Sequence, residues 1–110
     1  MNDAFQEREK GFERKYQLDQ DQQFRAQSRR DRIFGKWVAG KLGLTGAEVD
    51  PYAIEVVDSN FEKPGDEDML DKVKADLQAK QVNISDGDLR TSLLDAYGEA
   101  AREIAAESKK

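Results

Sequence analysis

Residues 29–46 read Arg-Arg-Asp-Arg-Ile-Phe-Gly-Lys-Trp-Val-Ala-Gly-Lys-Leu-Gly-Leu-Thr-Gly and contain the only tryptophan of the chain. On a helix that turns by about 100° per residue, the large apolar side chains fall on one half and a basic stripe falls on the other. The apolar half consists of Ile33, Phe34, Trp37, Val38 and Leu42. The basic stripe consists of Arg25, Arg29, Arg32 and Lys36. Gly43 suits the residue after a helix end and Thr45 suits the next N-cap, so this stretch predicts the first corner of the fold.

The helix that ends at this corner is predicted to begin at Asp19 or Asp21 and to run to Leu42, because acidic side chains favour a helix N-terminus. Phe24 continues its apolar half. Arg30 is a cation on the apolar half, so we expect it to extend toward solvent or to pair with an acidic side chain.

A second helix has two candidate starts. Thr45 and Glu48 form a capping-box pattern, whereas Asp50-Pro51 suits an N-cap followed by a proline at the first helical position. Both remain open from the sequence, and the helix should end before Lys63-Pro64-Gly65. Its predicted apolar residues are Tyr52, Ala53, Ile54, Val56, Val57 and Phe61.

Two more helices complete the pattern. Residues 66–68 are Asp-Glu-Asp and precede an apolar stripe, so we interpret them as N-terminal capping groups; no calcium-loop spacing is present. That stripe consists of Met69, Leu70, Val73 and Leu77, in a helix predicted to end near Lys80 or Gln81. Ser85 suits the N-cap of the last helix, and Gly98 in its middle suits a close approach by a neighbouring segment. The predicted buried face of the last helix consists of Leu89, Leu93, Tyr97, Ala100 or Ala101, and Ile104.

Four amphipathic helices with short connections, and no alternation typical of strands, predict an all-α fold. We expect a small four-helix bundle over residues 21–110, preceded by a separate segment over residues 1–20. The predicted aromatic core of the bundle consists of Phe24, Phe34, Trp37, Tyr52, Phe61 and Tyr97.

Residues 1–20 contain too few apolar side chains for a core, so we predict that they are mobile in the free protein. Phe5, Phe12 and Tyr16 nevertheless lie within about 40° of one another on a helical wheel, which is typical of a helix that lies in a groove of a partner. The alternatives are a frayed tail or a first turn packed on the surface of the same domain. The pattern alone does not separate these interpretations.

The chain contains no histidine and no cysteine, which excludes disulfides, thiol nucleophiles, Cys/His zinc sites and Ser-His-Asp triads. We therefore predict a protein that is not an enzyme and that needs neither metal nor cofactor. Nothing approaches the roughly 20 apolar residues of a membrane span, and the N-terminus lacks the pattern of a signal peptide. These features predict a cytoplasmic protein without direct membrane insertion, which we expect to be a monomer when free.

Charge is distributed unevenly around the formal net charge of −5. Residues 21–44 carry 6 basic and 2 acidic groups, whereas residues 45–110 carry 8 and 16. This acidic second half argues against a nucleic-acid partner, because duplex affinity depends on neutralised phosphates. The basic stripe is either a solvated face or a contact for an anion, an acidic protein or the phosphates of ATP or ADP. Candidate residues for that contact are Arg25, Arg29, Arg30, Arg32 and Lys36.

An ordered set of short motifs over nearly the whole chain resembles the ATPase inhibitor zeta-subunit family of alphaproteobacterial F-type ATP synthases. These motifs are Phe5-Gln-Glu-Arg-Glu-Lys-Gly-Phe-Glu-Arg-Lys-Tyr16, Phe24-Arg25, Ala26-Gln27-Ser28-Arg29-Arg30, Gly35-Lys36-Trp37, Tyr52-Ala53, Val56-Val57, Phe61-Glu62, Gly65-Asp66-Glu67-Asp68, Lys72-Val73 and Ala75-Asp76-Leu77.

The resemblance implies a four-helix domain whose N-terminal segment folds into the catalytic head of the synthase, formed by its alpha, beta and gamma subunits. There the segment would block rotation in the direction of ATP hydrolysis, and the protein would be associated with the cytoplasmic side of the inner membrane through the synthase. Carried over position by position, the inhibitory residues are Phe5, Arg8, Phe12, Glu13, Lys15 and Tyr16.

Overall fold

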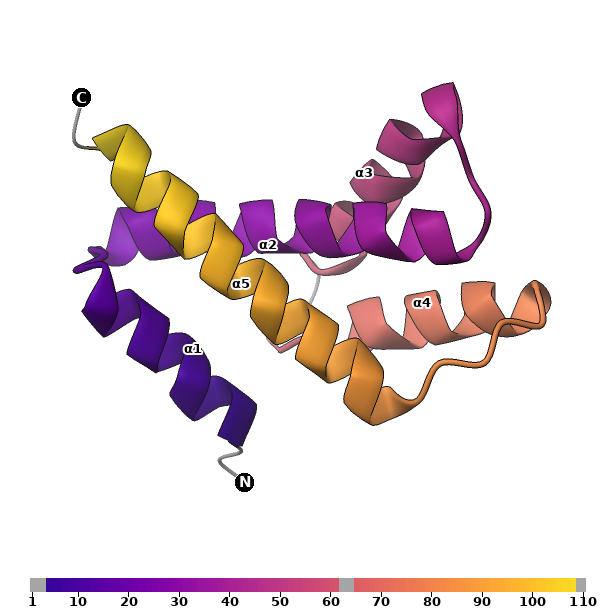
Figure 1. Cartoon of the computed structure of the whole chain (residues 1–110), viewed down its shortest axis with the longest axis horizontal. Helices are drawn as coiled ribbons and strands as arrows, with labels where there is room; N and C mark the ends of the chain where they lie inside the picture. The colour runs from indigo at the N-terminus through magenta and orange to yellow at the C-terminus, as the bar shows by residue number, and fades with distance from the viewer. Residues whose placement is uncertain (1–3, 62–64, 109–110) are drawn as a thin grey trace.

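The computed structural model describes residues 4–61 and 65–108, and these residues form five α-helices and one short 3-10 helix (Figure 1). The elements are α1 (Ala4–Lys15), α2 (Gln20–Lys41), η1 (Gly46–Glu48), α3 (Val49–Ser59), α4 (Glu67–Ala79) and α5 (Asp86–Ser108). No strand occurs in these residues, so the all-α prediction is confirmed. The helix count differs from the predicted four, because residues 4–15 form a fifth helix in front of the four predicted ones.

The start of α2 is set by a capping box at Asp19. The Asp19 carboxylate accepts a hydrogen bond from the Gln22 backbone at 2.8 Å, and the Gln22 side chain accepts one from the Asp19 backbone at 2.9 Å. These two bonds satisfy backbone N–H groups that would otherwise have no partner at the helix start. Of the two predicted starts, Asp19 is therefore the N-cap.

The corner after α2 follows the predicted pattern. Gly43 has a φ of 82°, a left-handed conformation that glycine adopts without strain, and the Leu44 amide donates to the Ala39 carbonyl at 3.0 Å. The Thr45 amide then donates to the Glu48 side chain at 3.3 Å, at the start of η1. Helix α3 begins directly after η1 at Val49, with Glu48 at its N-cap position and Pro51 as its third residue. The Thr45 start is therefore found at η1, whereas Asp50 lies inside α3 and is not an N-cap.

Helix α2 packs against α3 and α5, and α1 lies beside α5 on the other side from α3 and α4 (Figure 1). The main core lies among the four helices α2–α5 and contains no residue of α1. Its buried side chains are Phe34, Val38, Ala39, Tyr52, Val56, Met69, Leu70, Val73, Leu77, Leu89, Leu93 and Ala96. A second apolar cluster lies along α1, α2 and α5, and comprises Leu18, Ala26, Tyr97, Ala100, Ala101, Ile104 and Ala105.

Three predicted core residues are on the surface instead. Phe24 is 64% exposed, Phe61 is 61% exposed and Ile54 is 55% exposed. Phe24 lies two positions before the buried Ala26, and Ile54 lies two positions before the buried Val56. Because residues two apart point to roughly opposite sides of a helix, Phe24 and Ile54 point away from these buried neighbours. Phe61 follows the end of α3 and is no longer positioned by that helix.

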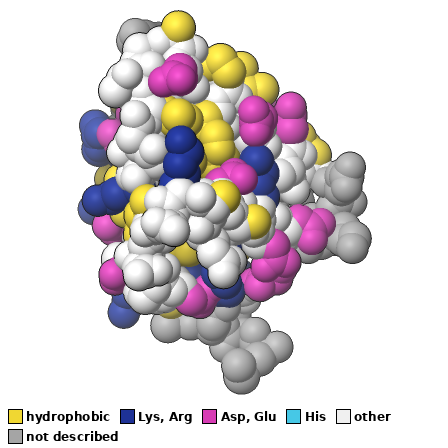
Figure 2. Space-filling view, turned by 90° about the vertical axis from the view of Figure 1, so that its right-hand side faces the viewer, with side chains coloured by type: hydrophobic (Ala, Val, Ile, Leu, Met, Phe, Trp, Pro, Cys, Tyr) yellow, Lys and Arg dark blue, Asp and Glu magenta, His cyan; other side chains and the backbone are white. Residues whose placement is uncertain are grey.

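The predicted stop after α3 falls partly outside the described residues, because Lys63 and Pro64 are not among them. Gly65 is described and has a φ of 88°, which suits glycine. The end of the molecule formed by α3 and α4 carries interspersed acidic and basic side chains, with hydrophobic atoms showing in the upper part of this face (Figure 2). Within the described ranges, no helix is both long and apolar enough to cross a membrane.

Candidate functional site

Helix α1 carries the residues assigned to partner binding, and it lies on the protein's own α5. Phe5, Phe12, Glu13 and Tyr16 are partly buried, whereas Arg8 and Lys15 are exposed. Leu18, in the turn after α1, is only 7% exposed and belongs to the second apolar cluster. Of the interpretations that the sequence leaves open, the structure shows the segment packed on the surface of the same domain, because Phe12, Tyr16 and Leu18 find apolar partners on α5 that local sequence does not reveal. The main core contains none of these residues. The mobility of this segment stays a prediction.

Phe12 contacts α5 at Gly98. A Cβ placed on Gly98 would lie 2.9 Å from Cζ of the Phe12 ring and 3.2 Å from its Cε1, closer than side chains normally approach. The absence of a side chain thus lets the aromatic ring rest directly on the backbone of α5. The predicted close approach at Gly98 is confirmed, and the neighbouring segment is α1.

Glu13 contacts α5 at Tyr97, the residue before Gly98. The buried Tyr97 hydroxyl donates a hydrogen bond to Glu13 Oε2 at 2.5 Å. Burial, together with this bond to a carboxylate, raises the pKa of Tyr97, so the hydroxyl keeps its proton throughout the physiological range. The bond between α1 and α5 therefore has a fixed donor and a charged acceptor, which makes it stronger than a bond between neutral groups.

Arg30 is the centre of a polar cluster under α1 and is only 1% exposed. Its guanidinium lies 2.8 Å from Glu9 Oε2 of α1, 2.9 Å from Asp31 Oδ1 and 2.7 Å from Asp66 Oδ1 at the start of α4. The prediction that Arg30 pairs with an acidic side chain is confirmed. Asp66 was predicted to cap α4; it does occupy the N-cap position, but its carboxylate binds Arg30 instead of the helix backbone.

Asn60 completes this cluster from the end of α3. Its side-chain amide donates to Asp31 Oδ2 at 2.9 Å and to Asp66 Oδ1 at 3.1 Å. Two of the three carboxylates around Arg30 are thus also held by a neutral donor. The cluster joins α1, α2, the end of α3 and the start of α4 through side chains that are distant in the sequence.

Three carboxylates around one guanidinium leave an excess of negative charge in a buried place. Burial raises the pKa of Glu9 and that of Asp31, although the charge of Arg30 opposes this shift in both cases. Burial by itself would lower the pKa of Arg30, but the three carboxylates outweigh it and the pKa is raised. Arg30 is therefore a permanent cation, and Glu9 is a contact residue of α1 that sequence reasoning missed. The only local signal for Glu9 is its place between Phe5 and Phe12 on the same side of α1.

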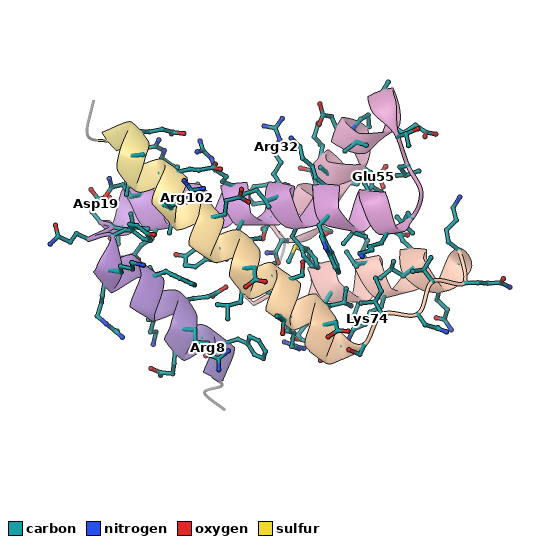
Figure 3. All side chains as sticks on the ribbon, in the orientation of Figure 1. Arg8, Asp19, Arg32, Glu55, Lys74 and Arg102 are labelled. Atoms are coloured by element: carbon teal, nitrogen blue, oxygen red, sulfur yellow. The ribbon has the colours of Figure 1, made fainter. Side chains whose placement is uncertain are left out.

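The basic stripe on α2 is largely paired with α5. Arg29 lies 3.2 Å from Glu103 Oε1 and also binds Glu107, which Arg25 approaches to 3.4 Å. Arg32 is exposed, stands out from α2 in Figure 3, and has no ion pair among the described residues. Lys36 lies 3.8 Å from Asp50 at the surface. Arg30 belongs to the buried cluster and lies away from this exposed stripe.

A groove of about 490 Å³ lies beside the stripe, between α2, α3 and the C-terminal part of α5. Its apolar surface includes the exposed Phe24 and Ile54, and its basic side chains are Arg25, Arg29 and Arg32. Phe24 and Ile54 thus line a surface groove. In the described part of the chain, no group of three or more His, Cys, Asp or Glu residues is arranged to hold a metal ion.

A family model described as ATPase inhibitor subunit zeta matches residues 1–103 of this chain. The matched range begins before α1 and ends within α5, so it includes both the contact between α1 and α5 and the Arg30 cluster. A search of curated proteins finds no match to the chain.

Proposed function

Because this chain belongs to the ATPase inhibitor subunit zeta family, we propose that it inhibits an F-type ATP synthase by inserting α1 into the catalytic head. Insertion between the alpha, beta and gamma subunits would block rotation in the direction of ATP hydrolysis. The inhibitor would act as a monomer on the cytoplasmic side of the membrane. The residues proposed to contact the head are Phe5, Arg8, Phe12, Glu13, Lys15 and Tyr16.

The observation that carries this proposal is that α1 is a complete helix outside the main core. The core among α2–α5 contains no residue of α1, and a short turn with Gln17 at a φ of 55° joins α1 to α2. Such a helix can change its neighbours while the bundle stays folded. The bundle would then remain outside the head as a stop.

The chemistry of α1 supports binding in a groove. Phe5 and Phe12 of α1 share one side of the helix with Tyr16, which directly follows it, and each aromatic side chain at the centre of an interface contributes roughly 2–4 kcal/mol to binding. The exposed Arg8 and Lys15 contribute less, because exposed charges are screened by water and salt. We therefore expect the aromatic residues to supply most of the affinity.

This proposal is tested by mixing the full-length protein with purified synthase head and measuring co-purification and ATP hydrolysis in the same sample. We expect the protein to co-purify and hydrolysis to fall. ATP synthesis by the intact synthase serves as the control, because a block in only one direction of rotation should spare it. Binding without a loss of hydrolysis would contradict the proposed mechanism.

A second candidate function is the binding of ATP or ADP in the groove beside the basic stripe. The combination of an exposed aromatic ring, an aliphatic wall and three arginines suits a base and its phosphates. Arg30 is excluded from this site, because it is buried and paired with three carboxylates.

Titration of the protein with ATP, followed through backbone amide shifts, tests this candidate. We expect shifts centred on Phe24, Arg29 and Arg32, and we expect Arg32→Ala to weaken binding by about tenfold, since it removes a charge-assisted contact to phosphate. Lys80→Ala is the matched control, because Lys80 is exposed at the end of α4. Equal effects of the two substitutions would contradict nucleotide binding in this groove.

A further inference from the structure

Phe12 and Glu13, two of the side chains proposed to bind the synthase head, also hold α1 against α5. We infer that the position of α1 on α5 is a self-masked state, and that α1 must leave α5 before it binds the head. This inference rests on the proposed function and adds a regulated step to it. While α1 is packed on α5, the protein is in a closed state that does not bind the head, and release of α1 gives the open state.

The masking follows from three contacts. The Phe12 ring lies on the backbone of Gly98, Glu13 accepts the Tyr97 hydroxyl bond, and Glu9 lies 2.8 Å from the buried Arg30 guanidinium. Phe12 and Glu13 cannot rest on α5 and at the same time lie in a groove of another protein. Binding to the head therefore competes with binding to α5.

When α1 leaves the Arg30 cluster, the buried charge of Arg30 keeps other partners. After Glu9 departs, Arg30 still has Asp31 and Asp66 as partners, and Asn60 still donates to both carboxylates. Removing the sole partner of a buried charge is strongly destabilising, whereas here two of three partners remain. Departure of Glu9 also reduces the excess of negative charge around Arg30. The contact thus favours the closed state while leaving the open state intact.

This competition has a measurable consequence. The apparent dissociation constant for the head equals the intrinsic constant divided by the fraction of molecules with α1 released. Substitutions on α5 that loosen α1 therefore strengthen inhibition, although they alter no residue of the inhibitory segment. A purely structural role for the same contacts predicts no such gain.

Two substitutions on α5 test the inference in the full-length protein. Tyr97→Phe removes the hydroxyl that binds Glu13, and Gly98→Ala adds a methyl group where the Phe12 ring lies. Tyr52→Phe is the matched control for the first, because the Tyr52 hydroxyl donates to Asp76 at 2.8 Å in a contact without α1. Gly40→Ala is the matched control for the second, because a Cβ there meets nothing within 4 Å.

Two readouts are needed: ¹⁵N relaxation of residues 4–15 in the free protein, and the affinity for the synthase head from inhibition of ATP hydrolysis. We expect Tyr97→Phe and Gly98→Ala to increase the motion of α1 and to tighten binding by about three- to tenfold, the effect of losing one charge-assisted hydrogen bond or one packed contact. The two controls should change neither quantity.

Other outcomes separate the ways in which the inference can be wrong. If the α5 substitutions release α1 but affinity stays the same or falls, α1 is not masked and the inference is overturned. Unchanged relaxation in both variants overturns it as well, because these contacts then do not hold α1. If wild-type protein and variants with released α1 all fail to inhibit, the proposed function fails, and the inference falls with it. Should Gly98→Ala disturb folding, Tyr97→Phe decides, because it adds no atom.

Discussion

A chain that lacks residues 1–15 should fail to inhibit ATP hydrolysis at any concentration at which the full-length protein inhibits completely. The reason is that the deletion removes Phe5 and Phe12, two of the three aromatic side chains that are proposed to supply most of the affinity for the head. The measurement is ATP hydrolysis by the purified head over a titration of each protein.

The deletion ends at residue 15 because the next part of the chain supports the bundle. Leu18 is buried in the second apolar cluster, and Asp19 caps α2. Loss of α1 uncovers Tyr97, Ala100 and Ala101, so we expect the free energy of unfolding to fall by about 1–3 kcal/mol while the bundle stays folded. Thermal unfolding followed by circular dichroism checks that the truncated protein is folded at the assay temperature.

A peptide of residues 1–19 added to the truncated protein provides the control for indirect damage. The peptide should restore inhibition, but at higher concentration, because it lacks the effective concentration that the covalent link supplies. Full inhibition by the truncated protein alone would show that α1 belongs to the structure of the domain and does not bind the head.

Replacing Arg30 with methionine should destabilise the protein by about 3–5 kcal/mol, because it leaves the carboxylates of Glu9, Asp31 and Asp66 close together without their shared cation. For a domain of this size, each kcal/mol lowers Tm by about 4–8 °C, so Tm should fall by more than about 10 °C. Differential scanning calorimetry measures this change.

Arg32→Met is the matched control. Arg32 is two residues away on the same helix but is exposed and has no ion pair among the described residues, so the same substitution should change stability by no more than about 0.5 kcal/mol. Adding Asp31→Asn and Asp66→Asn to Arg30→Met should recover part of the loss, since the repulsion between carboxylates is then removed. Equal stability of Arg30→Met and Arg32→Met would show that the cluster contributes nothing to the fold.

Local patterns in the chain are sufficient to predict the four helices after residue 19 and most of their ends, but they do not predict α1 or decide between the two starts of the second helix. The Asp19–Gln22 box and the Thr45–Glu48 pair join residues three apart, and Gly43 acts through its own backbone. Such interactions form wherever the local sequence is helical, so they depend little on the rest of the protein. The all-α class and the four helices after residue 19 follow from these signals together with the apolar periodicity.

The tertiary structure alone decides which side chains are covered. The apolar periodicity of α2 does not separate Phe24 from Ala26 as buried residues. In the structure only Ala26 is buried where α2 meets α5, whereas Phe24 lines the surface groove. Glu9 reaches Arg30 across 21 positions and Asp66 reaches it across 36, distances over which no local pattern acts. The position of α1 is decided in the same way. Phe5, Phe12 and Tyr16 are suited to any apolar groove, and in the folded protein Phe12 and Tyr16 pack on the second apolar cluster, because Gly98, Tyr97 and Arg30 are brought together there by the packing of the bundle.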